Sequence, residues 1–243
     1  TDYNIEIYCG TEVIGELDPI GARGTLYKDA IYQHLGRRYM SMELDLEKKL
    51  CRVDPVDVDY YTECVWESRV SLTESLEKSQ LRDAKLEFGY INVNRQPKLY
   101  KKIRERTLEN IGYGPITLDP FIYDTTGFSF RPPDAWRTAV MSVDKRHLGA
   151  ALYGLSYIMQ RTAPSLCLGD VKDIETDVSL SEVEEGQGKW YSALYLFDTI
   201  EGGVGYAEKI FEAFEEALKL CKSVIDECTC VAGCPSCVPA VPP

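Results

Sequence analysis

The sequence predicts an α+β fold, in which a β-rich, barrel-like N-terminal subdomain (residues 1–131) precedes an α/β subdomain (residues 132–243). Three observations predict it. Short stretches rich in β-branched and aromatic residues alternate with turn residues through the first part of the chain. After the Arg131-Pro132-Pro133 sequence, the apolar residues change to helical spacing. A cluster of cysteines then follows near the end of the chain, which indicates that cysteine chemistry holds this segment together locally.

The N-terminal part is expected to contain eight strands. They are predicted, in chain order, at residues 3–9, 12–17, 30–34, 38–44, 49–53, 64–72, 84–93 and 121–130. Turn residues such as Asp18-Pro19 and Asp54-Pro55 separate them. Residues 98–109 fit a strand and a short helix equally well. Many short strands with short connections favour a barrel or a strongly bent sheet.

The C-terminal part is expected to alternate helices and strands. Residues 144–160 and 206–221 have amphipathic helical spacing, and residues 190–197 form a continuous apolar run of strand length that predicts a central strand buried on both faces. Residues 170–185 contain seven acidic side chains and one lysine, from which we expect a solvated loop rather than an acidic metal site.

The overall composition is that of a globular protein, with 44% hydrophobic and 27% charged residues. A chain of 243 residues buries about 70–75% of its unfolded surface, so its core needs neither disulfides nor a metal. No apolar run approaches the roughly 20 residues of a membrane-spanning helix, and no membrane partner is expected. The chain starts with polar residues and no methionine, which predicts a processed chain or an excised piece of an intracellular protein, cytoplasmic or nucleoid-associated if prokaryotic.

The strongest chemical signal is a group of four thiols within ten residues, Cys228, Cys230, Cys234 and Cys237. Their spacing is C-x-C-x3-C-x2-C, and Gly233 and Pro235 allow the backbone to turn between them. Thiolates at this spacing can converge on a tetrahedral zinc ion with Zn–S distances of about 2.3 Å. Because four thiolates leave no open coordination position, the fold is expected to end in a structural zinc knuckle.

Other uses of these cysteines stay open at the level of sequence. Two disulfides would suit a secreted protein, an iron–sulfur cluster would accept four thiolates, and Cys234 with Cys237 would suit a redox pair. Cys221, seven residues before Cys228, is either a substitute ligand or a core residue. The four remaining cysteines lie among apolar neighbours and indicate packing in a reducing compartment, namely Cys9, Cys51, Cys64 and Cys167.

One segment is basic in an otherwise acidic protein. The formal net charge is −12, which argues against nucleic acid covering the whole surface but not against a local contact. Six basic residues with an interleaved aromatic residue follow one another, namely Arg95, Lys98, Tyr100, Lys101, Lys102, Arg104 and Arg106. This pattern suits a surface that holds phosphates and stacks a base, and Arg37-Arg38 beside Tyr39 is a second candidate. A solvated charged face is the alternative.

A glycine-rich turn precedes the last predicted helix. Asp198 is followed by three glycines, Gly202, Gly203 and Gly205. Backbone N–H groups at such a turn suit contact with a phosphate, whereas the simpler interpretation is a tight structural turn between strand and helix.

A metal-dependent nuclease is a further hypothesis. Four acids fall near the ends of predicted elements, namely Asp144, Asp170, Asp173 and Asp198. If they converged, they would be able to hold two metal ions. His34 and His147, the two histidines of the chain, are expected to be structural polar residues rather than general bases.

The tail over residues 225–238 resembles the zinc-binding C-terminal (MZB) domain of the mitomycin-repair-factor-A (MrfA) helicases. Residues 30–39, 43–46 and 56–62, and Asp198 with its glycine turn, are similar to that family's sequence in the same order. The resemblance implies a parent protein that is a superfamily 2 DNA helicase with ATP-driven 3′→5′ translocation and a role in DNA repair. It implies single-stranded or forked DNA and the motor domains of the same polypeptide as partners.

The motor motifs of such helicases are absent from this sequence. It contains neither a G-x-x-x-x-G-K-[ST] phosphate loop nor an Asp-Glu-x-His box, so ATP is expected only at motor domains outside this chain. The resemblance therefore predicts a non-catalytic accessory region that braces or guides DNA. A metal-dependent nuclease and a protein-interaction platform that packs on motor domains or a repair partner are the alternatives.

Overall fold

The computed structural model describes residues 3–143, 145–183 and 190–238. The chain divides into two compact units, one made of Thr1–Arg69 and Asn94–Ile122 and the other of Val70–Val93 and Tyr123–Pro243. None of the described helices is both long and apolar enough to cross a membrane. The two units are described separately below.

This division differs from a boundary after residue 131, because two long strands contribute to both units. β6 (Tyr60–Leu81) and β7 (Ala84–Arg104) each continue from one unit into the other. Because each strand is continuous where it changes unit, no break in secondary structure marks the change. The boundary between residues 131 and 132 stays a prediction.

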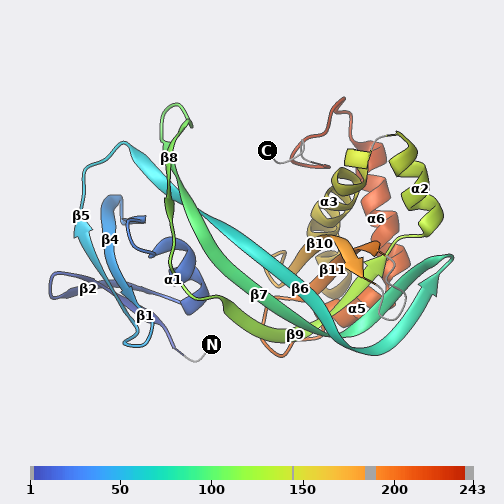
Figure 1. Cartoon of the computed structure of the whole chain (residues 1–243), viewed down its shortest axis with the longest axis horizontal. Helices are drawn as coiled ribbons and strands as arrows, with labels where there is room; N and C mark the ends of the chain where they lie inside the picture. Colours follow the sequence, from blue (N-terminus) through green and yellow to red (C-terminus); the bar gives the residue numbers. More distant parts are fainter. Residues whose placement is uncertain (1–2, 144, 184–189, 239–243) are drawn as a thin grey trace. The chain divides into compact units, whose positions relative to one another are not determined.

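The first unit contains a five-stranded sheet with the order β2-β1-β5-β4-β3 (Figure 1). Its strands are β1 (Ile5–Cys9), β2 (Glu12–Leu17), β3 (Ile31–His34), β4 (Arg37–Asp45) and β5 (Leu50–Pro55). β1 and β5 are parallel, and the other pairs are antiparallel. Alternate residues of β1 and β5 point into one apolar cluster with Ala22 and Leu26.

A helix was not expected after Asp18, where the sequence indicated only a turn. α1 (Pro19–Thr25) begins there because the Asp18 carboxylate accepts hydrogen bonds from the N–H groups of Ile20 and Gly21, at 3.0 and 2.9 Å. Pro19 has a fixed φ that suits the first helical position. The cap therefore compensates for two glycines inside a seven-residue helix.

The second sheet has the order β10-β11-β9-β7-β6, and β8 pairs with β7. The strands not yet given are β8 (Asn110–Pro115), β9 (Phe121–Arg131), β10 (Ile174–Val183) and β11 (Trp190–Asp198). Residues 98–109, which the pattern left undecided, belong mostly to β7 and to the turn before β8. The apolar residues Ala193–Phe197 of β11 are buried, as expected for a central strand.

The expected loop over residues 170–185 is wrong in its larger part, because residues 174–183 form β10 against β11. Ile174 and Val178 are buried, while Glu175 and Asp177 stand between them at half-buried positions. This is the period-two alternation of a strand with one face in the core. The high acidic content obscured it. Glu184 and Glu185 lie outside the described residues.

The described residues of the second unit form five helices (Figure 1). They are α2 (Asp134–Val143), α3 (Lys145–Thr162), α4 (Pro164–Cys167), α5 (Tyr206–Glu212) and α6 (Phe214–Glu227). The helix expected over 144–160 is confirmed as α3, and the one over 206–221 is interrupted at Ala213. Phe128 of β9 packs edge-on against Phe214, with ring centroids 5.5 Å apart. The predicted α+β class, with a β-rich, barrel-like first part and a terminal four-cysteine group, is confirmed.

Candidate metal centre

The four clustered cysteines lie directly after the last helix. Cys228 is the C-cap residue of α6, where the backbone becomes extended and its N–H donates to the Ile225 carbonyl at 3.3 Å. Gly233 adopts a φ of 89°, a left-handed conformation that favours glycine, and so turns the chain back before Cys234. The N–H of Cys237 donates to the Cys234 carbonyl at 3.2 Å and closes a tight turn between these two thiols.

This backbone path brings all four sulfur atoms within 4.8 Å of one another. The Sγ–Sγ distances are 3.6 Å for Cys228–Cys234, 3.4 Å for Cys230–Cys237 and 3.7 Å for Cys234–Cys237. Four sulfurs at about 2.3 Å from a tetrahedral zinc ion lie about 3.8 Å apart. The observed separations match that tetrahedron closely, so the four thiols fit a zinc ion.

Backbone donors favour the thiolate form at two of these positions. Hydrogen bonds from the N–H groups of Ser236 and Cys237 lower the pKa of the Cys234 thiol to about 6. A hydrogen bond from the Val238 N–H lowers the pKa of Cys237 as well. Hydrogen bonds with the Cys228 and Cys237 sulfurs raise the pKa of Cys230 to about 12. The turn at Cys234 thus supplies the negative charge that a divalent cation needs.

Helix α3 holds this knuckle against the second unit. The Tyr157 hydroxyl donates to the Pro235 carbonyl at 2.7 Å, and the Arg161 guanidinium lies 4.2 Å from the Tyr157 ring centroid. At Gly154, a Cβ atom would lie only 2.9 Å from Cγ1 of Val238. The missing side chain at Gly154 therefore lets the chain pass close to α3 after Cys237.

Cys221 is a core residue rather than a substitute ligand. Its thiol is buried in the apolar cluster of the second unit, and its sulfur lies 3.4 Å from the Thr162 hydroxyl of α3. Burial raises its pKa, which opposes metal binding. All nine cysteines are free thiols, of which Cys51 and Cys167 are buried and Cys9 and Cys64 are half-buried.

The glycine turn after β11 is organised by a buried carboxylate. Asp198 is 0% exposed, and its Oδ2 accepts from the N–H groups of Val204 and Gly205 at 2.6 and 2.8 Å. Its Oδ1 accepts from the Ala207 N–H at 2.8 Å. Asp198 therefore caps the N-terminus of α5, because the N-cap residue Gly205 has no side chain that could accept these hydrogen bonds.

Two further donors of this turn also bond within the protein. The Gly202 N–H donates to the Asp124 carbonyl at 2.8 Å, and the Gly203 N–H donates to the Ile200 carbonyl at 2.9 Å. All three glycines have φ between 77° and 88°, so the turn needs them for its backbone shape. The geometry favours the structural interpretation of Gly202, Gly203 and Gly205 over contact with a phosphate.

The acids considered for a nuclease do not form a second centre in the described part of the chain. The Asp198 carboxylate is used by backbone donors, and the Asp173 carboxylate accepts from the Asp170 N–H at 2.8 Å. Among the described residues, the cysteine cluster is the one group of three or more metal-binding side chains. Asp144 and the side chain of His147 lie outside the described residues.

Several cations of the predicted basic segment are paired with acids in the first unit. Lys98 lies 3.2 Å from Glu67, and Arg104 lies 3.5 Å from Asp59. The Lys102 ammonium lies 5.4 Å from the Tyr60 ring centroid, and Arg95 lies similarly against the Trp66 ring. The positive surplus on this surface is therefore smaller than the sequence run suggests.

Arg38, the second basic candidate, is also paired with an acid. Its guanidinium donates to both oxygens of Glu105 at 2.6 and 2.7 Å and to the Val58 carbonyl at 2.5 Å. These groups line a hollow of about 710 Å³ together with Arg106. Arg37 beside it is exposed at the start of β4. Both contacts with Glu105 come from Nη2 and the contact with Val58 comes from Nη1, and together they fix Arg38 in place.

Tyr100 lies in the interior, in contrast to the stacking role that its sequence position suggested. It is 5% exposed, and its ring stacks on Tyr27 with centroids 5.2 Å apart. Sequence reasoning missed Tyr113, which lies on the neighbouring strand β8 and is 65% exposed. The only signal for it was the alternation of residues along β8, which needs the strand register to be interpreted.

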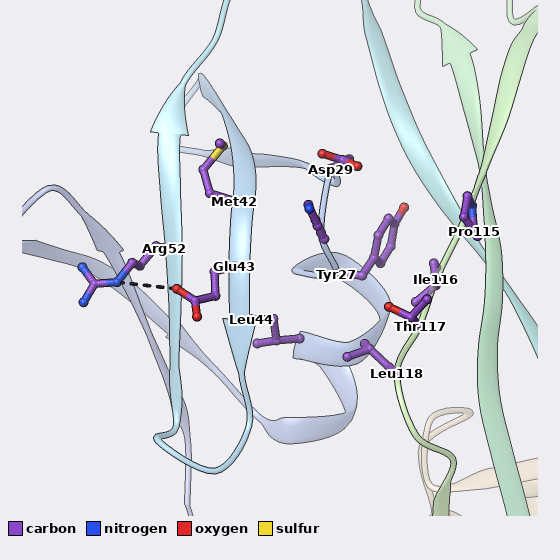
Figure 2. Close-up of a pocket in the computed structure, with 11 residues that line it drawn as sticks. Tyr27, Asp29, Met42, Glu43, Leu44, Arg52, Pro115, Ile116, Thr117 and Leu118 are labelled. Atoms are coloured by element: carbon purple, nitrogen blue, oxygen red, sulfur yellow. Dashed lines mark ion pairs between the residues drawn. The ribbon is translucent and has the colours of Figure 1, made fainter.

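A second hollow of about 790 Å³ lies in the first unit (Figure 2). Figure 2 shows Tyr27 and Ile116 facing Leu44 and Met42 across it. Its charged side chains are of both signs, and Arg52 lies 3.9 Å from Glu43.

The chain is similar to known helicases over most of its length. It is 31% identical over 229 residues to the uncharacterised ATP-dependent helicase YprA of Bacillus subtilis, and 24% identical over 246 residues to the ATP-dependent helicase HRQ1 of Saccharomyces cerevisiae. These alignments cover 93% and 94% of this chain. They cover 29% and 22% of the relatives, so the chain spans less than a third of their length.

Solved structures agree with this similarity. A crystal structure of the DUF1998 helicase MrfA bound to DNA superposes with a TM-score of 0.75 at 28% identity, covering 99% of this chain and 32% of that one. A second one, bound to DNA and AMPPNP, gives a TM-score of 0.66 at 27% identity, covering 98% of this chain and 30% of that one. The family model of the MrfA Zn-binding domain matches residues 155–238, which include all four clustered cysteines. The chain therefore contains a match to the MrfA Zn-binding (MZB) domain and is similar, over most of its length, to part of the MrfA-type helicases.

Proposed function

We propose that this chain is the accessory zinc-binding region of an ATP-dependent 3′→5′ DNA helicase that acts in DNA repair. It braces or guides single-stranded or forked DNA while motor domains of the same polypeptide hydrolyse ATP. The observation that carries the proposal is the four-thiol centre inside the MZB match, in a chain that resembles a DNA-bound helicase structure along almost its whole length.

Zinc has a structural role in this proposal. The four thiolates of Cys228, Cys230, Cys234 and Cys237 fill a tetrahedral shell, so no position stays open for a substrate or a water molecule. The ion would fasten the end of α6 to the chain that runs along α3. The free thiols at all nine cysteines support a reducing, intracellular compartment.

The proposed DNA contacts are local. The candidates on β7 and its turn are Arg95, Lys98, Lys101, Lys102, Arg104 and Arg106, with Arg37 and Arg38 on β4. Lys101 is the most informative of them, because three of the others have acidic partners (Lys98, Arg104 and Arg38). With a net charge of −12, the rest of the surface repels a polyanion.

A binding titration tests the proposal. The zinc-loaded chain is expected to bind a fluorescent oligothymidine, and affinity is expected to fall steeply with salt because phosphate contacts release counterions. The double substitution Lys101→Glu and Lys102→Glu should weaken binding and flatten the salt dependence, whereas Lys219→Glu on α6 should not. Absence of binding at low salt would contradict the DNA-guiding role and favour a protein-interaction platform.

The helicase part of the proposal needs the complete protein. A protein that contains this chain and its motor domains is expected to unwind a duplex with a 3′ single-stranded tail in the presence of ATP. A duplex with a 5′ tail is the matched control and should stay intact. Unwinding of only the 5′-tailed duplex would contradict the proposed direction.

A further inference from the structure

The end of β7 and the whole of β8 form a hairpin whose two faces differ in character. Leu99–Ile103 of β7 pair antiparallel with β8, and the register places Tyr100 opposite Gly114 and Lys101 opposite Tyr113. Opposite residues of an antiparallel pair point to the same face of the sheet, and the next pair points to the other face. Tyr100 and Tyr113 therefore lie on opposite faces of this hairpin.

The Tyr100 face is closed by packing. A Cβ atom at Gly114 would lie 2.3 Å from Cζ of Tyr100, so the Tyr100 ring covers the bare backbone of its cross-strand partner. Lys102 has the same relation to Gly112, where the nearest lysine carbon lies 4.0 Å from the added Cβ. The two glycines of β8 thus make room for β7 side chains on this face, which leaves no flat surface for a ligand.

The opposite face is open and combines an aromatic ring with a cation. Tyr113 is 65% exposed, Ile111 is 41% exposed, and the half-buried Lys101 lies directly across from Tyr113. We call these three residues the Tyr113 face. Opposite residues have Cβ atoms about 4.5–5.5 Å apart, so the Lys101 side chain is long enough to bring its ammonium beside the exposed ring.

We propose that the Tyr113 face binds single-stranded nucleic acid, with a base stacked on the Tyr113 ring and a backbone phosphate at the Lys101 ammonium. The inference rests on the proposed DNA-guiding function and adds the site of contact. A flat exposed ring accepts any base, and a lysine one strand away fits the short distance between a base and its own phosphate.

The charges around the hairpin turn favour this partner. Of the two acids there, Glu105 is paired with the Arg38 guanidinium, and Glu109 accepts a hydrogen bond from the Thr107 hydroxyl at 3.0 Å, which orients its carboxylate without neutralising it. Arg106 is exposed in the same turn, as is Leu108, whose φ is 56°. A cation beside an open ring is complementary to a phosphate and a base together, which distinguishes this face from a purely apolar protein-docking surface.

A comparison of two ligands with equal charge tests the stacking directly. The zinc-loaded chain is titrated with fluorescent oligothymidine and with an abasic oligonucleotide of the same length. The chain is expected to bind oligothymidine about tenfold more tightly, as one stacked base suggests. Tyr113→Ala should remove this preference, Tyr113→Phe should retain it, and Tyr90→Ala, at an exposed tyrosine of the second unit, should leave it unchanged.

The role of Lys101 is tested by the salt dependence of oligonucleotide binding. Lys101→Ala should lower the slope of log affinity against log salt by about 0.7, the value for one phosphate contact on a single strand. It should leave the ratio between the two oligonucleotides intact. If the unsubstituted chain binds DNA but the Tyr113→Ala variant keeps the full preference for oligothymidine over the abasic oligonucleotide, the Tyr113 site is wrong and the DNA-guiding function stands. If the unsubstituted chain binds neither oligonucleotide, both proposals fail.

Discussion

At the scale of single residues, Asp198 explains why the second unit needs a charged group in its interior. Both of its carboxylate oxygens accept backbone hydrogen bonds, and the donors are the N–H groups of Val204, Gly205 and Ala207. Helix starts leave such donors without partners, and a buried carboxylate is tolerated where donors surround it. The same bonds make the N–H groups of Val204, Gly205 and Ala207 unavailable to a phosphate.

Replacing Asp198 tests this role. Asp198→Ala is expected to lower the free energy of unfolding by about 2–4 kcal/mol, because three buried donors lose a charged acceptor. Urea unfolding of the zinc-loaded chain, followed by circular dichroism, measures the change. Glu208→Ala, an exposed acid in the first turn of α5, is the control and should change stability by less than about 0.5 kcal/mol. Equal effects of the two substitutions would contradict the capping role.

Substitutions at two neighbouring glycines distinguish the cost of backbone strain from the cost of a steric clash. Gly202 and Gly203 have φ values of 82° and 77°, but a Cβ at Gly202 meets no atom within 4 Å, whereas one at Gly203 would lie 2.0 Å from the Thr126 hydroxyl oxygen. Gly202→Ala is expected to cost about 1–2 kcal/mol of stability from φ alone. Gly203→Ala should cost about 1–3 kcal/mol more.

The clash at Gly203 has its own control. Adding Thr126→Gly to Gly203→Ala removes the hydroxyl and the Cβ-linked atoms that block the new methyl group. The double variant should therefore lose less stability than the sum of the two single variants, as measured by urea unfolding. Strict additivity would show that contact with Thr126 does not explain the need for glycine at this position.

At the scale of elements, the four-cysteine knuckle begins at the end of α6, and the Tyr157 hydroxyl of α3 holds it through the Pro235 carbonyl. Cys234→Ser removes one of four thiolates and is expected to reduce zinc to well below one equivalent per chain, as measured by elemental analysis after gel filtration. Cys221→Ser is the matched control, since Cys221 contacts Thr162 in the core, and it should retain the metal. Loss of zinc in Cys221→Ser alone would contradict the ligand assignment.

β10 and the β7–β8 hairpin show which features of an element can be predicted from its own sequence and which cannot. Ile174 and Val178 alternate with Glu175 and Asp177, so the residue pattern of a strand exists in the sequence. The many acidic residues led to the prediction of a loop instead. The hairpin is different, because its open face depends on pairing with a second strand. Tyr100 and Tyr113 are both tyrosines near lysines in the sequence, and only the register decides that Tyr113 is exposed.

At the scale of the whole molecule, the two units have separate apolar clusters, so loss of zinc is expected to affect only one of them. Hydrogen exchange before and after treatment with a chelator measures this. Amides at the end of α6 and around Cys237 should exchange faster without zinc, whereas those of β1 and β5 should not change. Faster exchange throughout the five-stranded sheet would contradict a local structural role for the metal.

The sequence by itself determined the α+β class, most strands, helix α3 and the four-thiol cluster. Those features depend on local periodicity or on ligands only a few residues apart, such as Cys234 and Cys237. Tertiary structure decided the rest. The pairing of β7 with β8 buried Tyr100 and exposed Tyr113, and the fold around Asp198 turned its glycine-rich segment into a helix cap. These outcomes depend on contacts between residues distant in the chain, and a local sequence pattern does not contain the identity of the distant partner.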